Sequence, residues 1–129
     1  MKKYYYHITS FQGWAAVLKQ GIFASKDGYI YMLDTDDNAV CTVLIRKMNS
    51  IKVYTSRGCG VFRIDPAGLT APVEADEDGL KYDTKFTLPH QFRVKQQVIE
   101  PKYLKSKSMR HIIDPAMHID SRDDFKMLK

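Results

Sequence analysis

The chain has 129 residues, of which 44% are hydrophobic and 12% aromatic, and its formal net charge is +5. This length and composition exclude an intrinsically disordered chain and predict a single globular domain covering residues 1–129. The positive charge permits attraction to nucleic acid or to an anionic cofactor. Two cysteines, Cys41 and Cys59, are too few for a disulfide-stabilised secreted domain, so we expect reduced, buried thiols and a cytoplasmic location.

Several sequence signatures are missing, and each absence narrows the class of protein. No apolar run has the length of a membrane span, and the N-terminus is too short and polar for a secretion signal, so we expect no membrane partner. No zinc-ligand spacing occurs, so we expect no metal site. Neither GxGxxG nor GxxxxGK[ST] is present, and the sequence contains no repeat.

The first thirty-three residues predict a strand, a helix and a second strand. Tyr4–Thr9 is aromatic and β-branched, which is typical of a strand. Ser10 is a good N-cap and Gly21 a suitable C-cap for a helix over 11–20, where Phe11, Trp14, Ala15 and Leu18 follow at helical spacing. Tyr29–Leu33 is almost wholly apolar and predicts a buried strand.

The next segment contains a turn and an element of ambiguous type. Lys26-Asp27-Gly28 predicts a turn before the second strand. Asp36 and Asn38 are candidate caps for a following element at Ala39–Met48. That element is predicted as a helix, although its Val, Thr and Ile content is also compatible with a strand.

The rest of the chain favours short strands, which we expect at residues 51–55, 60–65, 82–86, 90–94 and 98–99. A flexible joint is expected at 57–60, and an acidic loop at 70–82. Residues 105–129 are expected to form a basic tail or a C-terminal helix. This order predicts an α+β fold with helices in the N-terminal half and antiparallel strands later.

Three short stretches combine residues that are suited to ligand chemistry. They are Tyr6-His7-Ile8-Thr9, Gly28-Tyr29-Ile30-Tyr31-Met32 and His90-Gln91-Phe92-Arg93-Val94, and the last is followed by Pro101-Lys102-Tyr103-Leu104. Their order and approximate spacing over residues 4–104 resemble the ADP-ribosyltransferase superfamily, in particular its poly- and mono-ADP-ribosyltransferase branch with a His–Tyr–Glu triad. Gln91 stands at the position of the catalytic Glu.

The resemblance implies a split antiparallel β-sheet that binds NAD and transfers ADP-ribose to protein or nucleic acid, as in toxin-type relatives. It implies that His7 and Thr9 hold a ribose, and that the backbone of Ile8 pairs with the nicotinamide amide. It also implies that Tyr31 stacks on nicotinamide, with Tyr29 on the same strand face as the other candidate. Gln91 would orient the ribose that is attacked.

The sequence departs from the family pattern in three places. Gln91 carries no charge for the oxocarbenium-like transition state, Ile8 replaces the usual Gly, and no second stacking Tyr occurs near Thr42. Arg63 and Arg93 are candidate phosphate clamps.

Two other functions remain open. One is a catalytically degenerate module that binds NAD or ADP-ribose, and the other is a basic nucleic-acid-binding domain that uses the Lys102–Arg110 cluster. Ordinary structural roles also remain open: His7 as a strand-end histidine bonded to backbone, Tyr31 as a core residue, and Gln91 as an exposed strand residue.

Overall fold

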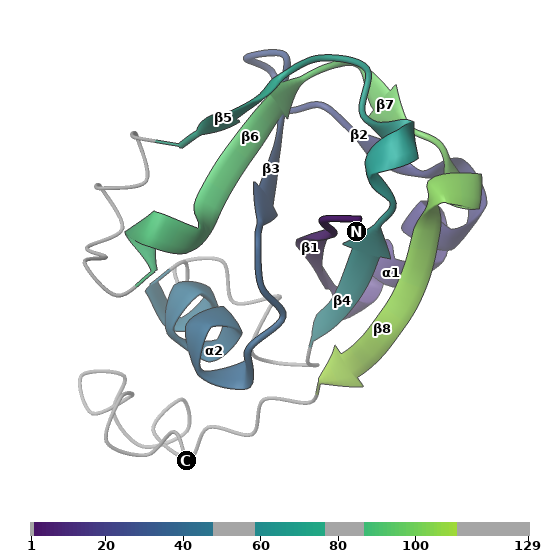
Figure 1. Ribbon diagram of the computed structural model, residues 1–129. Helices are drawn as coiled ribbons and strands as arrows, with labels where there is room; N and C mark the ends of the chain where they lie inside the picture. The colour runs from purple at the N-terminus through teal and green to yellow at the C-terminus, as the bar shows by residue number, and fades with distance from the viewer. Residues whose placement is uncertain (1, 48–58, 77–86, 111–129) are drawn as a thin grey trace.

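The computed structural model describes residues 2–47, 59–76 and 87–110, which form an α+β fold (Figure 1). The elements in chain order are β1 (Tyr5–Ser10), α1 (Phe11–Gln20), β2 (Ile22–Phe23), β3 (Tyr29–Leu33), α2 (Asn38–Lys47), β4 (Cys59–Ile64), β5 (Val73–Ala75), β6 (Gln91–Lys95), β7 (Val98–Ile99) and β8 (Leu104–Arg110). Six strands form one sheet in the order β5-β6-β3-β1-β4-β8, and β2 pairs with β7. All these pairs are antiparallel, as the sequence predicted.

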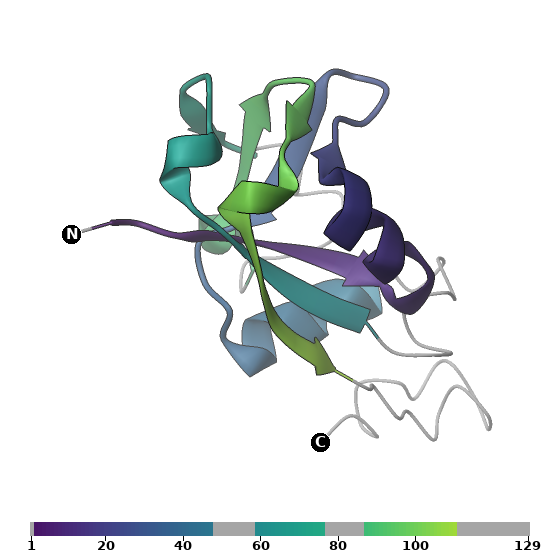
Figure 2. The same ribbon diagram turned by 90° about the vertical axis from the view of Figure 1, so that its right-hand side faces the viewer.

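Each helix packs against a different face of the large sheet. Val17 and Trp14 of α1 belong to the same apolar cluster as Phe62 of β4, and we call this side of the sheet the α1 face. Val40 of α2 packs with Leu33 of β3 on the opposite side, which we call the α2 face. Figure 2 shows the two helices on opposite sides of β1.

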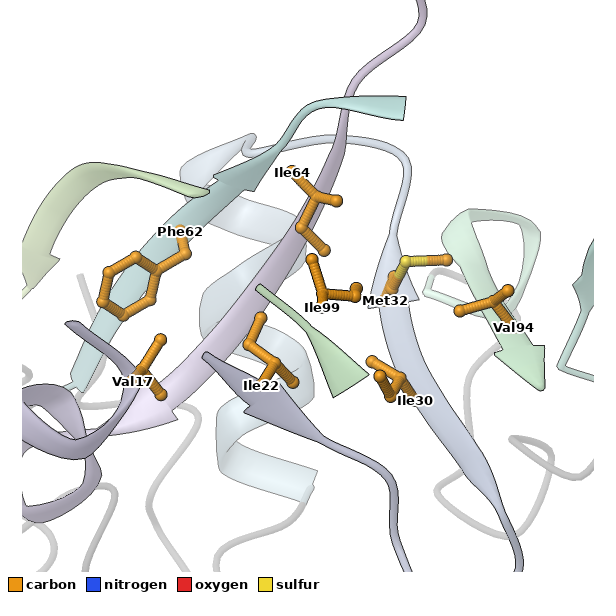
Figure 3. Packing of buried hydrophobic residues seen from close by; sticks show 8 residues of the cluster. All are labelled: Val17, Ile22, Ile30, Met32, Phe62, Ile64, Val94 and Ile99. Atoms are coloured by element: carbon orange, nitrogen blue, oxygen red, sulfur yellow. The ribbon is translucent and has the colours of Figure 1, made fainter. Parts of the chain in front are cut away.

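The main core lies on the α1 face, between the large sheet and the β2–β7 pair (Figure 3). Period-two alternation along the strands directs one set of side chains to this face. The core side chains are Val17, Ile22, Ile30, Met32, Phe62, Ile64, Val94 and Ile99, each at most 8% exposed. The β2–β7 pair is short, but Ile22 and Ile99 make it the lid of this core.

The end of α1 depends on the conformational freedom of Gly21. Its φ of 92° lies in the left-handed region, and its N–H donates to the Val17 carbonyl oxygen at 2.9 Å. A Cβ at this position would collide with the carbonyl oxygen of Ile99 in β7. The predicted glycine C-cap is therefore confirmed, and it also allows the chain to pass close to β7.

The start of α2 differs from the prediction in the residue that caps it. The Asp37 carboxylate accepts hydrogen bonds from the backbone N–H groups of Ala39 at 3.0 Å and Val40 at 3.1 Å. The cap is therefore Asp37, and the sequence-based choice of Asp36 or Asn38 is wrong. The preference for a helix here over a strand is confirmed.

Replacing Asp37 by Ala is expected to lower the free energy of unfolding by about 1 kcal/mol, because two N–H groups of the first turn lose their acceptor. Urea denaturation measures the effect. Asn38→Ala is the matched control, and we expect it to change stability by less than about 0.5 kcal/mol. Equal losses in the two variants would contradict the assignment of the cap.

Two strands lie where the sequence predicted irregular structure. Val73–Ala75, within the expected acidic loop, pairs with β6 as β5. Residues 104–110, which include the start of the expected tail or helix, form β8 and pair with β4. The expected joint at 57–60 is wrong for Cys59, which begins β4, whereas the strand predicted at 60–65 is confirmed. The strands predicted at 51–55 and 82–86, and residues 111–129, lie outside the described residues.

Candidate functional site

The large sheet consists of two three-stranded halves that are joined at one residue pair. β1 and β3 pair only through Tyr6 and Leu33, whereas β1 pairs with β4 over six positions, from Tyr5 to Ser10. In Figure 1, β5, β6 and β3 lie on one side of this join, and β4 and β8 on the other. Beyond Tyr6, the edge of β1 that faces β3 therefore has no strand ladder within the described part of the chain.

His7 spans this gap with its side chain. Its Nδ1 lies 2.9 Å from the Tyr31 carbonyl oxygen. Because a carbonyl can only accept, Nδ1–H is the donor, and the lone pair of the neutral ring lies on Nε2. Burial lowers the pKa of His7, with the Tyr31 carbonyl opposing the shift, so the ring is neutral at physiological pH.

The polar backbone groups of Ile8 also point into the gap. In an antiparallel sheet, a residue's N–H and C=O point to the same side, and successive residues alternate. The Tyr31 carbonyl points towards β1, so that of Leu33 does too, and the Tyr6–Leu33 pair exchanges its hydrogen bonds directly. Tyr6 therefore points its backbone groups towards β3, and Ile8, two residues later, does the same.

The opposite edge of β1 supports this assignment. Asp65 donates its N–H to the Tyr103 carbonyl oxygen, just before β8, so by alternation the N–H and C=O of Phe62 in β4 point towards β1. Phe62 is the partner of His7, which leaves the groups of Ile8 directed away from β4. The gap thus presents one peptide-like donor and acceptor pair in the plane of the sheet, beside the His7 ring.

The predicted site residues divide between the two faces of the sheet. His7 pairs with Phe62 and Thr9 with Gly60, on the α1 face. Tyr31 and Gln91 alternate with Met32 and Phe92 and lie on the α2 face, as do the paired residues Arg93 and Leu33. The structure therefore brings Tyr31 and Gln91 to one face, and His7 meets Tyr31 through its backbone carbonyl at the gap.

The side chain of Ile8 lies on the α2 face and is half-buried. It packs against the cluster of Leu33, Val40 and Cys41, together with Leu44. The backbone polar groups of Ile8 thus face the gap, whereas its side chain packs beside the gap, under α2. Cys41 is 0% exposed, as its predicted role as a buried filler requires.

Tyr31 takes part in a polar network on the α2 face. Its hydroxyl donates to the Asp27 carboxylate, and burial followed by this hydrogen bond raises the pKa of Tyr31 to about 12. The same hydrogen bond is the main cause that lowers the pKa of Asp27. Tyr31 is therefore a neutral phenol, anchored to the turn that precedes its own strand.

Arg93 lies beside Tyr29 in the same network. Its guanidinium is 4.1 Å from the Tyr29 ring centroid, and its Nε donates to the Glu74 carboxylate at 2.8 Å. The hydrogen bond to Glu74 is the largest of the causes that raise the pKa of Arg93. Arg93 is therefore a cation on the α2 face, and its charge is paired with that of Glu74.

Gln91 is buried, at 5% exposed, so the alternative of an exposed strand residue is wrong. Its Oε1 accepts a hydrogen bond from the Thr87 hydroxyl at 2.7 Å, and Thr87 itself is fully buried. Its backbone carbonyl accepts from the N–H of Asp76 at 3.0 Å. Gln91 is therefore held by its neighbours in one orientation.

Three acidic residues near the predicted site were not anticipated as part of it. Asp27 was read only as a turn residue, and Glu74 and Asp76 only as members of an acidic loop. Their approach to Tyr31, Arg93 and Gln91 results from the β5–β6 pairing and from the tight turn before β3. An edge strand of three residues is too short to show an alternating pattern, so the sequence alone had little chance of revealing them.

No helix in the described part of the chain is long and apolar enough to cross a bilayer. Across residues 2–47, 59–76 and 87–110, no three His, Cys, Asp or Glu side chains meet as metal ligands would. No protein-family model matches the chain, and no curated protein or solved structure is significantly similar to it.

Proposed function

We propose that this chain is an ADP-ribosyltransferase-like domain that binds NAD at the gap between β1 and β3. The observation that carries the proposal is the orientation of the Ile8 N–H and C=O, which face the gap where the ladder with β3 has stopped. A nicotinamide carboxamide has one acceptor and one donor, as a peptide group does. It can therefore pair with Ile8 as a strand residue would.

The neighbouring groups supply further contacts for such a ligand. The neutral His7 ring offers Nε2 as an acceptor, so a ribose hydroxyl would donate to it. Tyr31 offers an aromatic ring on the α2 face, and Arg93 a positive charge for a pyrophosphate. The split sheet expected from the family resemblance is consistent with this mode of binding.

Transfer of ADP-ribose to a protein or nucleic acid is part of the proposal, with Gln91 at the position of the family's carboxylate. An uncharged amide already bonded to Thr87 gives the transition state little electrostatic stabilisation. Loss of one such stabilising group typically slows an enzyme by about 10²–10³. We therefore expect slow turnover if Gln91 acts alone, and binding without turnover is the catalytically degenerate alternative.

The proposal is tested by titrating NAD calorimetrically and by measuring nicotinamide release chromatographically. His7→Asn is the decisive variant, because an Asn amide can keep the bond to the Tyr31 carbonyl but has no counterpart of Nε2. We expect its Kd for NAD to be about tenfold weaker, which corresponds to one lost hydrogen bond.

The matched control is Lys19→Glu, which changes an exposed residue on α1, away from the gap, and should leave the Kd unchanged. Absence of NAD binding in the wild-type protein would refute the proposal. Equal affinities for wild type and His7→Asn would refute the gap as the binding site.

A second candidate function, binding of nucleic acid, is favoured by a basic surface on the α2 face of β4 and β8. Lys105 pairs with Arg63, so the two side chains lie next to each other, and the Arg63 guanidinium is 4.2 Å from the Tyr4 ring centroid. On such a surface the cations can contact the phosphates of a nucleic acid, and the aromatic ring can stack on one of its bases. The Lys107 ammonium lies 3.4 Å from the Asp36 carboxylate, which offsets part of this charge.

Lys105→Glu is expected to weaken binding of a fluorescent single-stranded oligonucleotide several-fold and to reduce its salt dependence, because one phosphate contact is lost. Fluorescence anisotropy at several salt concentrations measures both quantities. The control is again Lys19→Glu, on the α1 side of the sheet. If the two charge reversals have the same effect, the attraction is only that of the net charge.

A further inference from the structure

We propose that Asp76 supplies the carboxylate that stabilises cleavage of the nicotinamide–ribose bond, in place of the Glu that Gln91 replaces. This inference rests on the proposed function and extends it by one catalytic residue. Asp76 directly follows β5, and its backbone lies opposite Gln91 of the neighbouring strand β6.

The position of Asp76 follows from the β5–β6 ladder. Glu74 pairs with Arg93 and Ala75 with Phe92, and the Asp76 N–H donates to the Gln91 carbonyl oxygen at 3.0 Å. Asp76 is therefore the direct neighbour of Gln91 across the strands. Since side chains alternate along a strand, Asp76 lies on the same face as Glu74, which is the α2 face.

Asp76 is also well placed in electrostatic terms. It is 7% exposed, so a negative charge on this carboxylate is little screened by water. Such a charge acts on Tyr31, because Asp76 is among the causes that raise the pKa of that phenol. The stacking ring and the carboxylate thus lie on one face, within electrostatic range of each other.

The chemistry requires a negative charge at this place. The C1′–N1 bond of NAD breaks with its electron pair going to the nitrogen, so the pyridinium leaves as neutral nicotinamide. The positive charge passes to the ribose C1′ and ring oxygen, and the Asp76 carboxylate stabilises it. A hydroxyl of water or of an acceptor then forms the new C1′–O bond and releases its proton to solvent.

Asp76→Asn tests the inference, because it removes the charge and keeps the shape. We expect nicotinamide release to fall by about 10²–10³, while the Kd for NAD stays within about threefold. The matched control is Glu100→Gln, which removes the same charge from an exposed residue just after β7. Because Glu100 pairs with Lys102 and lies outside the proposed site, its loss should change the release rate by less than about tenfold.

A charge exchange separates a catalytic role from a structural one. In the double variant Asp76→Asn with Gln91→Glu, the carboxylate moves one strand, to the position where the family carries it. We expect this variant to recover most of the release rate that Asp76→Asn loses. If Asp76→Asn does not fold, the single variant Gln91→Glu tests the role of Asp76 instead. We expect this variant to raise the rate of nicotinamide release by less than about tenfold, because Asp76 already supplies a carboxylate.

The outcomes separate this inference from the function on which it rests. Wild-type release in Asp76→Asn, a gain of more than about 10² in Gln91→Glu, or NAD binding without any release would overturn the role of Asp76 and leave NAD binding intact. No NAD binding in the wild-type protein would overturn the proposed function itself, and the inference with it.

Discussion

Replacing Gly60 by Ala is expected to lower the free energy of unfolding by about 3 kcal/mol, the upper end for overpacking a core. The Trp14 ring lies directly on Gly60, where a Cβ would overlap three of its carbon atoms. The ring cannot retreat easily, because its centroid is 4.2 Å from that of Phe62, a fully buried residue. The methyl group must therefore displace α1 from β4.

Chemical denaturation of Gly60→Ala measures the loss, and a double-mutant cycle identifies its cause. Trp14→Leu is destabilising by itself, because it leaves space on the α1 face. In that background the Gly60→Ala substitution should cost less than about 1 kcal/mol, since the clashing ring is gone. A cost that is the same in both backgrounds would show that Trp14 is not the obstacle.

The elements predicted correctly are those whose side chains face a core. Tyr29–Leu33 forms a strand with the predicted limits, and three of its residues, Ile30, Met32 and Leu33, are buried. Residues 11–20 form the predicted helix, but its buried face carries Trp14 and Val17, whereas Leu18 of the predicted apolar face is 54% exposed. An element with one buried face carries apolar residues at regular spacing in its sequence, and this spacing can be recognised without the structure.

The elements that were missed lie at the two edges of the large sheet. β8 begins Leu104-Lys105-Ser106-Lys107, and edge strands are rich in Lys because charge discourages pairing with other chains. β5 is a three-residue strand at the other edge. Three residues are too few to show an alternating pattern, and the start of β8 has the composition of a tail. The pattern therefore predicts a loop for β5 and a tail or helix for β8.

The sequence indicated which residues form the candidate site, but not how they are arranged in space. Sequence order identified His7, Tyr31 and Gln91, but the face that each occupies depends on pairing registers that no local pattern encodes. The end of the β1–β3 ladder after Tyr6 is likewise a property of the whole sheet. Asp76 becomes a candidate only once the β5–β6 register places it beside Gln91.

The contribution of His7 to stability is expected to decrease as the pH falls below about 6.5, the ordinary imidazole value. Burial lowers the pKa of His7 in the folded protein, so the folded state resists protonation. Above pH about 6.5 both states carry the neutral ring, and the hydrogen bond to the Tyr31 carbonyl contributes fully. Below it the unfolded chain binds a proton that the folded chain does not, which favours unfolding until the folded pKa is reached.

The measurement is urea denaturation of the wild-type protein and of His7→Asn at about pH 7.5 and about pH 5. Every other ionisable group is the same in the two proteins, so the difference in stability between them isolates His7. This difference should shrink or reverse as the pH falls, by at most about 1.4 kcal/mol per pH unit. A difference that is constant with pH would mean that His7 titrates alike in both states. The ring would then not be the neutral acceptor on which the proposed contact with a ribose hydroxyl depends.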